Sequence, residues 1–361
     1  MPKLSAVANS AGRGVELVTG GVDTHADVHV AAALDQVGGR LGVEAFPATA
    51  AGYRDLEAWL RSFGPLGRVG VEGTGSYGAG LCRHLSRSGV VVVEVSRPDR
   101  SARRSRGKSD PMDAENAARQ VLAGEATGTP KTQDGIVEAI RVLHTVRRGA
   151  VKARTAAFNA FAAVLTTAPE ELRAALSGLS RDRRLETAAG FRPGPELDRP
   201  LAATKQALRR LARRIQQLGE EIDEAEAELD ALTRQAAPRV RAEFGVGPDS
   251  AAQLLVTAGD NPDRMVSEAS FAALCGTSPV QASSGKIVRH RLNRGGDRQA
   301  NRALHTIMLC RMRHDPATKA YVKAQTADGH SNREIQRKLK RALARRFAKI
   351  LMDTPTPARL A

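Results

Sequence analysis

Aromatic side chains are scarce in this chain of 361 residues. Only 3% of the sequence is Phe, Trp or Tyr, and Trp59 is its single tryptophan. Proteins that hold single-stranded nucleic acid mainly by stacking bases use platforms of exposed aromatic rings. The composition therefore argues against such stacking as the main mode of ligand binding.

Cysteines and long apolar runs are also rare. Cys82, Cys275 and Cys310 lie far apart, so they form neither a disulfide framework nor a CxxC metal motif. No stretch reaches 18 uninterrupted apolar residues, and the first twenty residues lack the apolar core of a secretory signal. We therefore expect a cytoplasmic protein, with no membrane partner, in a reducing compartment.

Acidic residues are outnumbered by basic ones. The chain has 55 Lys and Arg against 39 Asp and Glu, a formal net charge of +16. Residues 281–361 alone hold 19 Lys and Arg against 5 Asp and Glu. Cations that neutralise phosphates release condensed counterions, so a block of this kind favours nucleic-acid binding. The alternative is a solvated basic surface that only aids solubility.

Strand and helix patterns alternate over residues 15–125. Two strand patterns fill residues 17–35, and a third lies at 42–48. Apolar residues at helical spacing follow in 49–63, then a short strand from Arg68, a helix ending at Gly89, the strand VVVVEVS and a helix beginning near Pro111. Three strands followed by alternating helix and strand predict an α/β domain of the RNase H-like (RuvC-like) class.

The rest of the chain is predicted to be mostly helical, with a coiled-coil domain over 129–237 and a C-terminal domain over 240–350. Apolar positions step by three and four along 201–232, which is a heptad seam. This seam packs either within the monomer, against the 129–175 helix, or between two subunits. In the C-terminal domain, the turn Gly245–Pro248 is predicted to begin a helix. It either serves only as this helix start or also contacts a phosphate through its backbone. Residues 331–353 are predicted to form a basic amphipathic helix. The seam consists of Leu201, Thr204, Leu208, Leu211, Ile215, Leu218, Ile222, Ala225, Leu229 and Leu232.

Four acidic residues from three segments are candidates for a metal site. Asp23 ends the first strand in GVDTH, and Glu72 follows a strand in GVEGTGSY. Asp110 and Asp113 are three residues apart at a helix start, so they lie on one side of it. Hard divalent cations prefer carboxylate oxygens, and Mg²⁺ pairs assist phosphodiester chemistry. Together the four acids predict a Mg²⁺ site.

Three of the four acids could instead have a purely structural role. Asp23 suits a turn, Asp110 a helix N-cap and Asp113 a favourable first-turn charge. Glu72, between two small or apolar neighbours, has no comparable structural role. His25 and His29 are interpreted as packing or polar-face residues, because a zinc site would need further His or Cys nearby.

These motifs resemble the DEDD transposases of the insertion-sequence one-ten family. GVDTH, GVEGTGSY and RPDRSARRSRGKSDPMDAENAAR resemble the N-terminal domain of that family. FAALCGTSPVQASSGKIVRHRLNRGGDRQANRALHTIML resembles its second characteristic domain. The resemblance covers nearly the whole chain in the expected order, ending in a mostly α-helical transposase domain.

The resemblance implies a RuvC-like fold in which Asp23, Glu72, Asp110 and Asp113 bind Mg²⁺. It also implies a serine nucleophile in ASSGK, either Ser284 or its neighbour Ser283; one glycine precedes Lys here, where many relatives have two. The implied protein is the recombinase of an insertion sequence. It cleaves and exchanges donor and target DNA through a phosphoserine intermediate, guided by a structured noncoding bridge RNA. Its particle is a homo-oligomer, a dimer or tetramer, that combines acids and serine from different subunits.

Basic residues near both motif blocks are predicted to contact nucleic acid. Two other functions remain open. A RuvC-like nuclease or junction resolvase would use water as the nucleophile, and a basic scaffold would bind nucleic acid without catalysis. Four intact acids disfavour the scaffold. The predicted nucleic-acid contacts are Arg103, Arg104, Arg106, Lys108, Lys286, Arg289, Arg291, Arg294 and Arg298.

Overall fold

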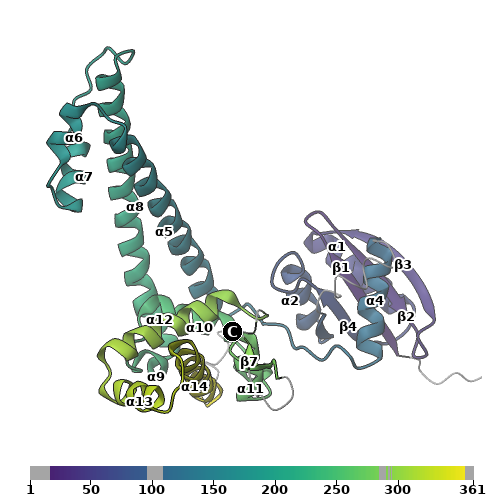
Figure 1. Ribbon diagram of the computed structural model, residues 1–361. Coiled ribbons are helices and arrows are strands. Elements are labelled where there is room, and N and C mark those ends of the chain that lie inside the picture. The colour runs from purple at the N-terminus through teal and green to yellow at the C-terminus, as the bar shows by residue number, and fades with distance from the viewer. Residues whose placement is uncertain (1–16, 96–108, 284–289, 292, 294, 354–361) are drawn as a thin grey trace, which may run out of the picture. The chain divides into compact units, whose positions relative to one another are not determined.

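A computed structural model describes residues 17–95, 109–283, 290–291, 293 and 295–353 (Figure 1). The chain divides into two compact units, residues 1–133 and 134–361. Within the described residues, no helix has the length and apolar character needed to cross a membrane. The three domain ranges inferred from the sequence, 15–125, 129–237 and 240–350, stay predictions.

The first unit is built on a five-stranded mixed sheet with the order β3-β2-β1-β4-β5. β1 (Val18–Thr24), β2 (Val28–Leu34) and β3 (Arg40–Pro47) are antiparallel neighbours. β4 (Leu66–Glu72) and β5 (Val91–Val95) extend the sheet parallel to β1. The predicted strands are confirmed, and this mixed α/β sheet is compatible with a RuvC-like domain.

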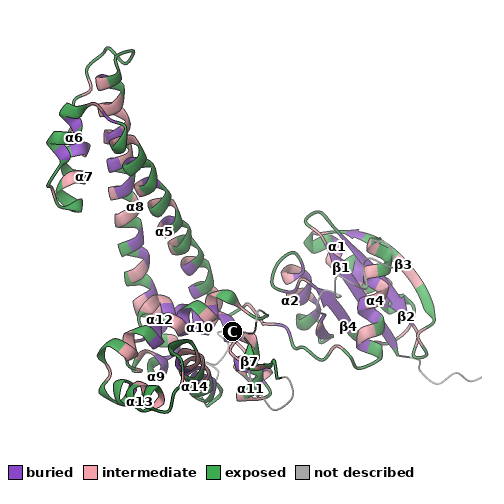
Figure 2. Ribbon diagram, in the orientation of Figure 1, coloured by how far each residue is buried: buried purple, intermediate pink, exposed green. Residues whose placement is uncertain are grey.

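Helices cover both faces of this sheet (Figure 1). On one face, Leu56 and Leu60 of α1 (Ala50–Ser62) and the apolar side of α2 (Ala79–Arg87) share a core with Val22. On the other face lies α4 (Asp110–Leu122), whose Val121 packs beside Val93 and Val95 of β5. β1 and β2 are buried on both sides, which explains their nearly continuous apolar sequences. The edge strand β3 is mostly exposed, as Figure 2 shows.

Helix α4 lies unusually close to the sheet because two glycines face it. A Cβ on Gly21 of β1 would lie 2.2 Å from the carbonyl oxygen of Ala114 and 2.2 Å from the amide nitrogen of Ala118. A Cβ on Gly70 of β4 would lie 2.8 Å from the carbonyl oxygen of Ala117. Any larger residue would push the helix away, so these glycines set its distance from β1 and β4.

Two long helices form an antiparallel pair in the second unit (Figure 1). α5 (Ile136–Thr166) and α8 (Pro200–Ala236) contact along their length. Ile140 shares a core with Leu229 near one end, and Phe161 shares a core with Leu208 near the other. All ten positions of the predicted seam are buried or half-buried. The seam therefore packs within the chain, whereas its supercoiling as a coiled coil stays a prediction.

The remainder of the second unit is mostly helical. Short helices α6 (Glu170–Leu176) and α7 (Arg181–Ala189) connect α5 to α8, and the helical region continues after α8. Phe271, Leu304 and Phe347 share one core with the base of the α5–α8 pair. The predicted helix at Pro248 is confirmed, and its phosphate contact stays a prediction. The later elements are α9 (Pro238–Arg241), α10 (Pro248–Ala258), η1 (Pro262–Arg264), α11 (Glu268–Leu274), β6 (Val280–Gln281), β7 (His290–Arg291), α12 (Arg298–His314), α13 (Pro316–Ala327) and α14 (Asn332–Met352).

Substitution of Gly21 tests the close approach of α4. We expect Gly21→Ala to destabilise the first unit by about 3 kcal/mol or more, because the new methyl group meets helix backbone that cannot rotate away. Gly20→Ala is the matched control: its Cβ would meet only side-chain atoms, of Leu60 at 3.0 Å and Val69 at 3.1 Å, so we expect a smaller loss of about 1 kcal/mol. Trp59 is the single tryptophan and lies in this unit, so its fluorescence during urea denaturation reports both values. Equal losses in the two variants would contradict the proposed role of Gly21.

Candidate active site

Asp23 and Glu72 lie side by side at the carboxyl ends of two parallel strands. The register pairs Gly21 with Gly70 and Val22 with Val71, so the two acids come next on their strands. Because alternate strand residues share a face, both acids lie on the face that Gly21 and Gly70 present to α4. Neighbouring strands are roughly 5 Å apart. Both residues are buried, 6% and 7% exposed. Two buried acids at this distance carry a large free-energy cost unless a cation or hydrogen bonds compensate them.

A hydroxyl group ties these two strand ends together. The Oγ1 of Thr24 donates a hydrogen bond to the carbonyl oxygen of Glu72 at 2.8 Å. Thr24 itself is buried, so the bond is shielded from water. A side-chain hydrogen bond therefore holds the relative positions of Asp23 and Glu72, in addition to the backbone ladder of the sheet.

The N-terminus of α4 brings the other two acids to this edge of the sheet. Asp110 is the first residue of the helix, and Asp113 follows in the same first turn. Negative charge is favoured there by the helix dipole. The side chain of Asp110 is 45% exposed, whereas that of Asp23 is 8% exposed. The group thus opens to solvent on the side of α4.

His25 completes a compact group of metal-ligating atoms. Its Nε2 lies 3.2 Å from Oδ2 of Asp23 and 3.4 Å from Oδ1 of Asp110. Potential ligand atoms of these three residues all lie within 4.8 Å of one another. Glu72 and Asp113 are also among the residues that the structure describes, but they do not belong to that group. The structure therefore brings Asp23 and Asp110 together, with Glu72 on the neighbouring strand and Asp113 in the same helical turn.

The three side chains fit a divalent cation. Two carboxylates and an imidazole are a mixed oxygen and nitrogen donor set, which Mn²⁺ accepts and to which Mg²⁺ binds mainly through the oxygens. The arrangement could bind a metal and orient water or phosphate beside it. His25 lies two residues after Asp23 and directly follows the last residue of β1, Thr24, and this closeness in sequence was the available signal. The sequence had indicated a packing or polar-face role for His25, whereas the structure places its ring beside Asp23 and Asp110.

His29 has a different role from His25. It is fully buried, and its ring stacks on Tyr53 with centroids 5.6 Å apart. Burial lowers the pKa of His29, which favours the neutral ring. His29 is thus a packing residue.

The candidate serines belong to the connection between β6 and β7. Val280 pairs with Arg291 and Gln281 with His290, so residues 282–289 connect the two strands. Ser283 is exposed and lies two residues beyond β6. Of the predicted nucleic-acid contacts, Arg291 is exposed on β7 and Arg298 is the exposed first residue of α12. The others, with Ser284, lie outside the described residues: Arg103, Arg104, Arg106, Lys108, Lys286, Arg289 and Arg294.

Two glycines hold the segments before and after this connection against each other. Gly276 and Gly296 have φ of +62° and +81°, a region that disfavours other residues. A Cβ on Gly296 would lie 2.5 Å from the carbonyl oxygen of Leu274, and one on Gly276 would lie 2.6 Å from that of Gly295. Backbone contact at this point fixes the segment after α11 beside the start of α12.

Asp297 anchors the start of α12 through four hydrogen bonds. Its carboxylate accepts from the backbone nitrogens of Gln299 and Ala300 at 2.8 and 3.2 Å, which is an N-cap. It also accepts from Oγ1 of Thr257 at 2.8 Å and Nε2 of Gln253 at 3.1 Å, both on α10. The helix that follows the candidate serine segment is therefore fixed to the core of the unit.

Comparisons with known proteins agree with this architecture. Residues 20–169 match a family model for DEDD transposases of IS110 elements, described as "Transposase". Residues 237–323 match one described as "Transposase IS116/IS110/IS902 family". The chain is also similar to the "Insertion element IS110 uncharacterized 43.6 kDa protein" of Streptomyces coelicolor, with 34% identity over 119 residues. That alignment spans 32% of this chain and 29% of the relative. The chain belongs to the IS110 family of DEDD transposases, and this family implies a divalent metal.

Metal titration tests the acidic group without any activity measurement. We expect saturating Mn²⁺ or Mg²⁺ to stabilise the first unit, by about 2.7 kcal/mol at a hundred times the Kd, as followed by Trp59 fluorescence in urea. Asp110→Asn should remove most of this gain while leaving metal-free stability unchanged or higher, because one of several like charges is lost. His25→Gln should weaken the effect of Mn²⁺ more than that of Mg²⁺.

Asp27→Asn is the matched control for this titration, since Asp27 is an exposed acid in the same β1–β2 turn and outside the donor group. It should respond to metal as the unmodified chain does. Ser109, not Asp110, is the N-cap of α4, so the cap role that the sequence allowed for Asp110 is wrong. A large loss of metal-free stability in Asp110→Asn would instead show that the charge of Asp110 mainly stabilises the first turn of the helix.

A second pair of variants tests the glycine contact near the serines. Gly296→Ala should lower the thermal midpoint of the second unit strongly, because it adds both an unfavourable positive φ and a clash with backbone oxygens. Gly329→Ala is the control: Gly329 has φ +80°, but its Cβ would meet nothing within 4 Å. The control should lose only about 1 kcal/mol. Far-ultraviolet circular dichroism measures both, and equal midpoints would rule out the backbone contact as a constraint.

Proposed function

We propose that this protein is the transposase of an insertion sequence, an enzyme that cleaves and rejoins donor and target DNA. The observation that carries the proposal is the convergence of Asp23, His25 and Asp110 near the carboxyl end of β1. Potential metal-ligand atoms of these three residues all lie within 4.8 Å of one another. Membership of the IS110 family, through matches in both halves of the chain, supports the same conclusion.

The acids would hold Mg²⁺ in this proposal. Asp23 and Asp110 are the central ligands, with Glu72 and Asp113 completing the predicted set and His25 beside them. Bound Mg²⁺ would polarise a phosphoryl oxygen and lower the pKa of the attacking hydroxyl. The chain's own contribution is to fix these carboxylates on β1, β4 and α4, so that their positions do not depend on loops.

The nucleophile we propose is a serine hydroxyl, from Ser284 or Ser283. Its oxygen attacks a phosphodiester, forming a serine–phosphorus bond as the bond to the leaving nucleoside oxygen breaks. The serine proton departs and the leaving oxygen takes up a proton. Because the new bond is also a phosphodiester, a later attack by another DNA hydroxyl rejoins strands without ATP. The exposed Arg291 and Arg298 follow the candidate serines closely in sequence and would contact the DNA phosphates. The other predicted basic residues would do the same.

We further propose that a structured noncoding RNA selects the donor and target sequences, and that the working particle is a homo-oligomer. Charge supports the first proposal: a chain with net charge +16 and few aromatic residues suits binding to phosphate backbones. The acids and the serine belong to different units of the chain, which supports an active site assembled from more than one subunit. The α5–α8 pair would serve as a distinct arm in that assembly, with supercoiled packing along its seam.

A second candidate is a RuvC-like nuclease in which water attacks. One observation favours it: the acidic group is complete within the first unit and requires nothing from the serine segment. The two functions differ in one product, because only the transposase forms a covalent bond between protein and DNA.

Trapping of that bond tests the proposal. DNA containing the element's own ends, supplied with RNA transcribed from its noncoding flank, should yield a covalent protein–DNA adduct with the unmodified chain. The double variant Ser283→Ala/Ser284→Ala should lose the adduct and recombination while it still binds RNA, and the single variants should assign the nucleophile. Normal recombination by the double variant would exclude the serine, and cleavage without any adduct would favour water.

A further inference from the structure

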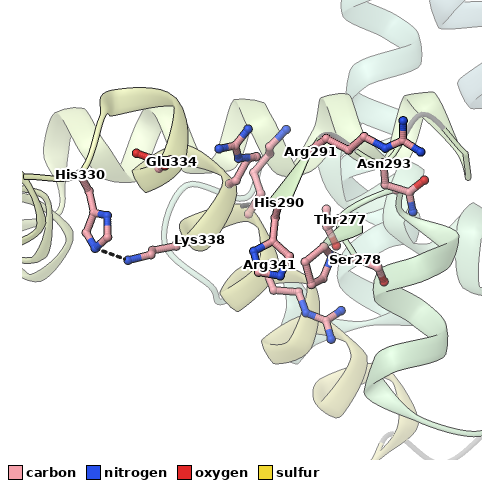
Figure 3. A pocket seen from close by; sticks show the side chains of 13 residues that line it. Thr277, Ser278, His290, Arg291, Asn293, His330, Glu334, Lys338 and Arg341 are labelled. Carbon is pink, nitrogen blue, oxygen red and sulfur yellow. Dashed lines mark hydrogen bonds between the residues drawn. The ribbon is translucent and has the colours of Figure 1, made fainter. Parts of the chain in front are cut away.

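The second unit contains a cavity of about 360 Å³ beside the hairpin of the candidate serines (Figure 3). Helix α14 forms one wall, with Arg337, Lys338 and Arg341 among its contributions. The opposite wall consists of residues 276–279 and of His290 and Arg291 on β7. This volume is about ten times that of a water molecule, so it is large enough for a nucleotide unit.

Positive charge in this cavity is barely compensated. The described residues that line it include five Arg or Lys side chains, Arg291, Arg337, Lys338, Lys340 and Arg341, and a single carboxylate, Glu334. That carboxylate accepts hydrogen bonds from the backbone nitrogen and Oγ of Ser331 at 2.9 and 2.7 Å, and these bonds lower the pKa of Glu334. Glu334 is thus engaged in capping its own helix.

The cations themselves have few anionic contacts. Within the described part of the chain, no ion pair joins any of the five to a carboxylate. Nη1 of Arg341 is buried and has no hydrogen-bond partner among the described residues. Burial and, next, the charge of Arg337 lower the pKa of Lys340. Crowded cations of this kind raise the free energy of the cavity until an anion enters it.

The walls are held in place by specific hydrogen bonds. Nζ of Lys340 donates to Oδ1 of Asn301 at 3.0 Å, and Nδ2 of Asn301 donates to the carbonyl oxygens of Cys275 and Gly276 at 2.9 and 3.1 Å. This chain links α14 to α12 and to the opposite wall. Lys338 is placed by contacts of Nζ with Nε2 of His330 at 2.8 Å (Figure 3) and with Oε1 of Gln325 at 2.7 Å. The cavity is therefore preorganised, which reduces the entropy lost when a ligand binds.

We propose that this cavity binds a backbone phosphodiester of the nucleic-acid strand on which the serine acts, at a linkage close to the scissile one. Arginine forks and lysine ammonium groups match phosphate oxygens, and β6 and β7, which border the serine segment, meet at the wall formed by His290 and Arg291. Arg337, Lys338 and Arg341 are thus positioning residues for the strand. The position beside the scissile linkage rests on the proposed serine chemistry, whereas phosphodiester binding by the cavity does not.

Chemical protection of one lysine locates the bound strand. Lys338 and Lys349 are both exposed on α14, but only Lys338 lines the cavity. Acetylation of each is measured by mass spectrometry with a 20-nucleotide single-stranded DNA, its duplex or the RNA of the same sequence. At about ten times the Kd, the effective probe should reduce acetylation of Lys338 roughly tenfold and leave Lys349 unchanged. Protection by either DNA probe supports the proposal and shows whether the strand is single or paired. Protection by the RNA alone would overturn the position beside the scissile linkage.

A matched pair of double variants measures the contribution to binding. Arg337→Ala/Arg341→Ala removes two charges that line the cavity, and Arg333→Ala/Lys349→Ala removes two exposed charges from the same helix outside it. With the probe that protects Lys338, the first pair should lower affinity at least tenfold and reduce the salt-dependence slope by about 1 to 2, since each lost phosphate contact removes roughly 0.7–0.9. The second pair should change both less. Circular dichroism checks folding, and if the first pair fails to fold, protection of Lys338 alone decides the outcome.

The outcomes separate this inference from the proposed function. Ser283→Ala/Ser284→Ala should keep Lys338 protected, because it leaves the cavity intact. Protection of Lys338 by none of the three probes, or equal losses in the two double variants, would overturn the cavity proposal and leave the transposase proposal standing. Protection together with a normal adduct in the serine variant would overturn the serine chemistry and leave the cavity as a phosphodiester site.

Discussion

The acidic site depends on how closely helix α4 lies on the sheet. Gly21 and Gly70 leave no side chain between the strands and the helix, whose backbone would contact any Cβ placed there. Strand alternation then carries the same face forward to Asp23 and Glu72, two residues beyond each glycine. The helix begins at Asp110, so its approach and its first carboxylate are set together. One packing constraint thus determines both the fold of this unit and the distances among its acids.

Glycine contacts have a similar effect in the second unit. Gly276 and Gly296 allow the segment after α11 to meet the start of α12, backbone against backbone. Asp297 then connects α12 to Thr257 on α10, and Asn301, one turn further on, connects it to the carbonyl groups of Cys275 and Gly276. Glycine costs conformational entropy on folding, so such positions are worthwhile only where a side chain would prevent close approach. In both units the approach fixes residues beside a candidate site.

The sequence predicted local elements well, because strand alternation and helical spacing are local properties. It located the strand that carries Asp23 near its end, the helix near Pro111 and the heptad seam of α8. Contacts between segments that are distant in sequence could not be predicted from these local patterns. Periodicity showed that Leu208 and Leu229 share a face, but not that α5 covers this face. The contact of His25 with Asp110 became clear only from the placement of α4. The cavity joins His290 to Arg341, from elements about fifty residues apart.

The fold shows where basic side chains of the last 81 residues lie. Arg345 forms an ion pair with Glu268, and Arg346 shares Glu243 with Arg311, so these charges on α14 have carboxylate partners. Arg337 and Arg341, on the same helix, line a cavity in which the one carboxylate is already engaged with Ser331. A count of charges treats all four arginines alike, but within the described part of the chain only the second pair adds an uncompensated positive field to the cavity. Such a field attracts a polyanion before contact and concentrates it at the recess. The charge would therefore bring a strand to the serine hairpin before any chemistry begins.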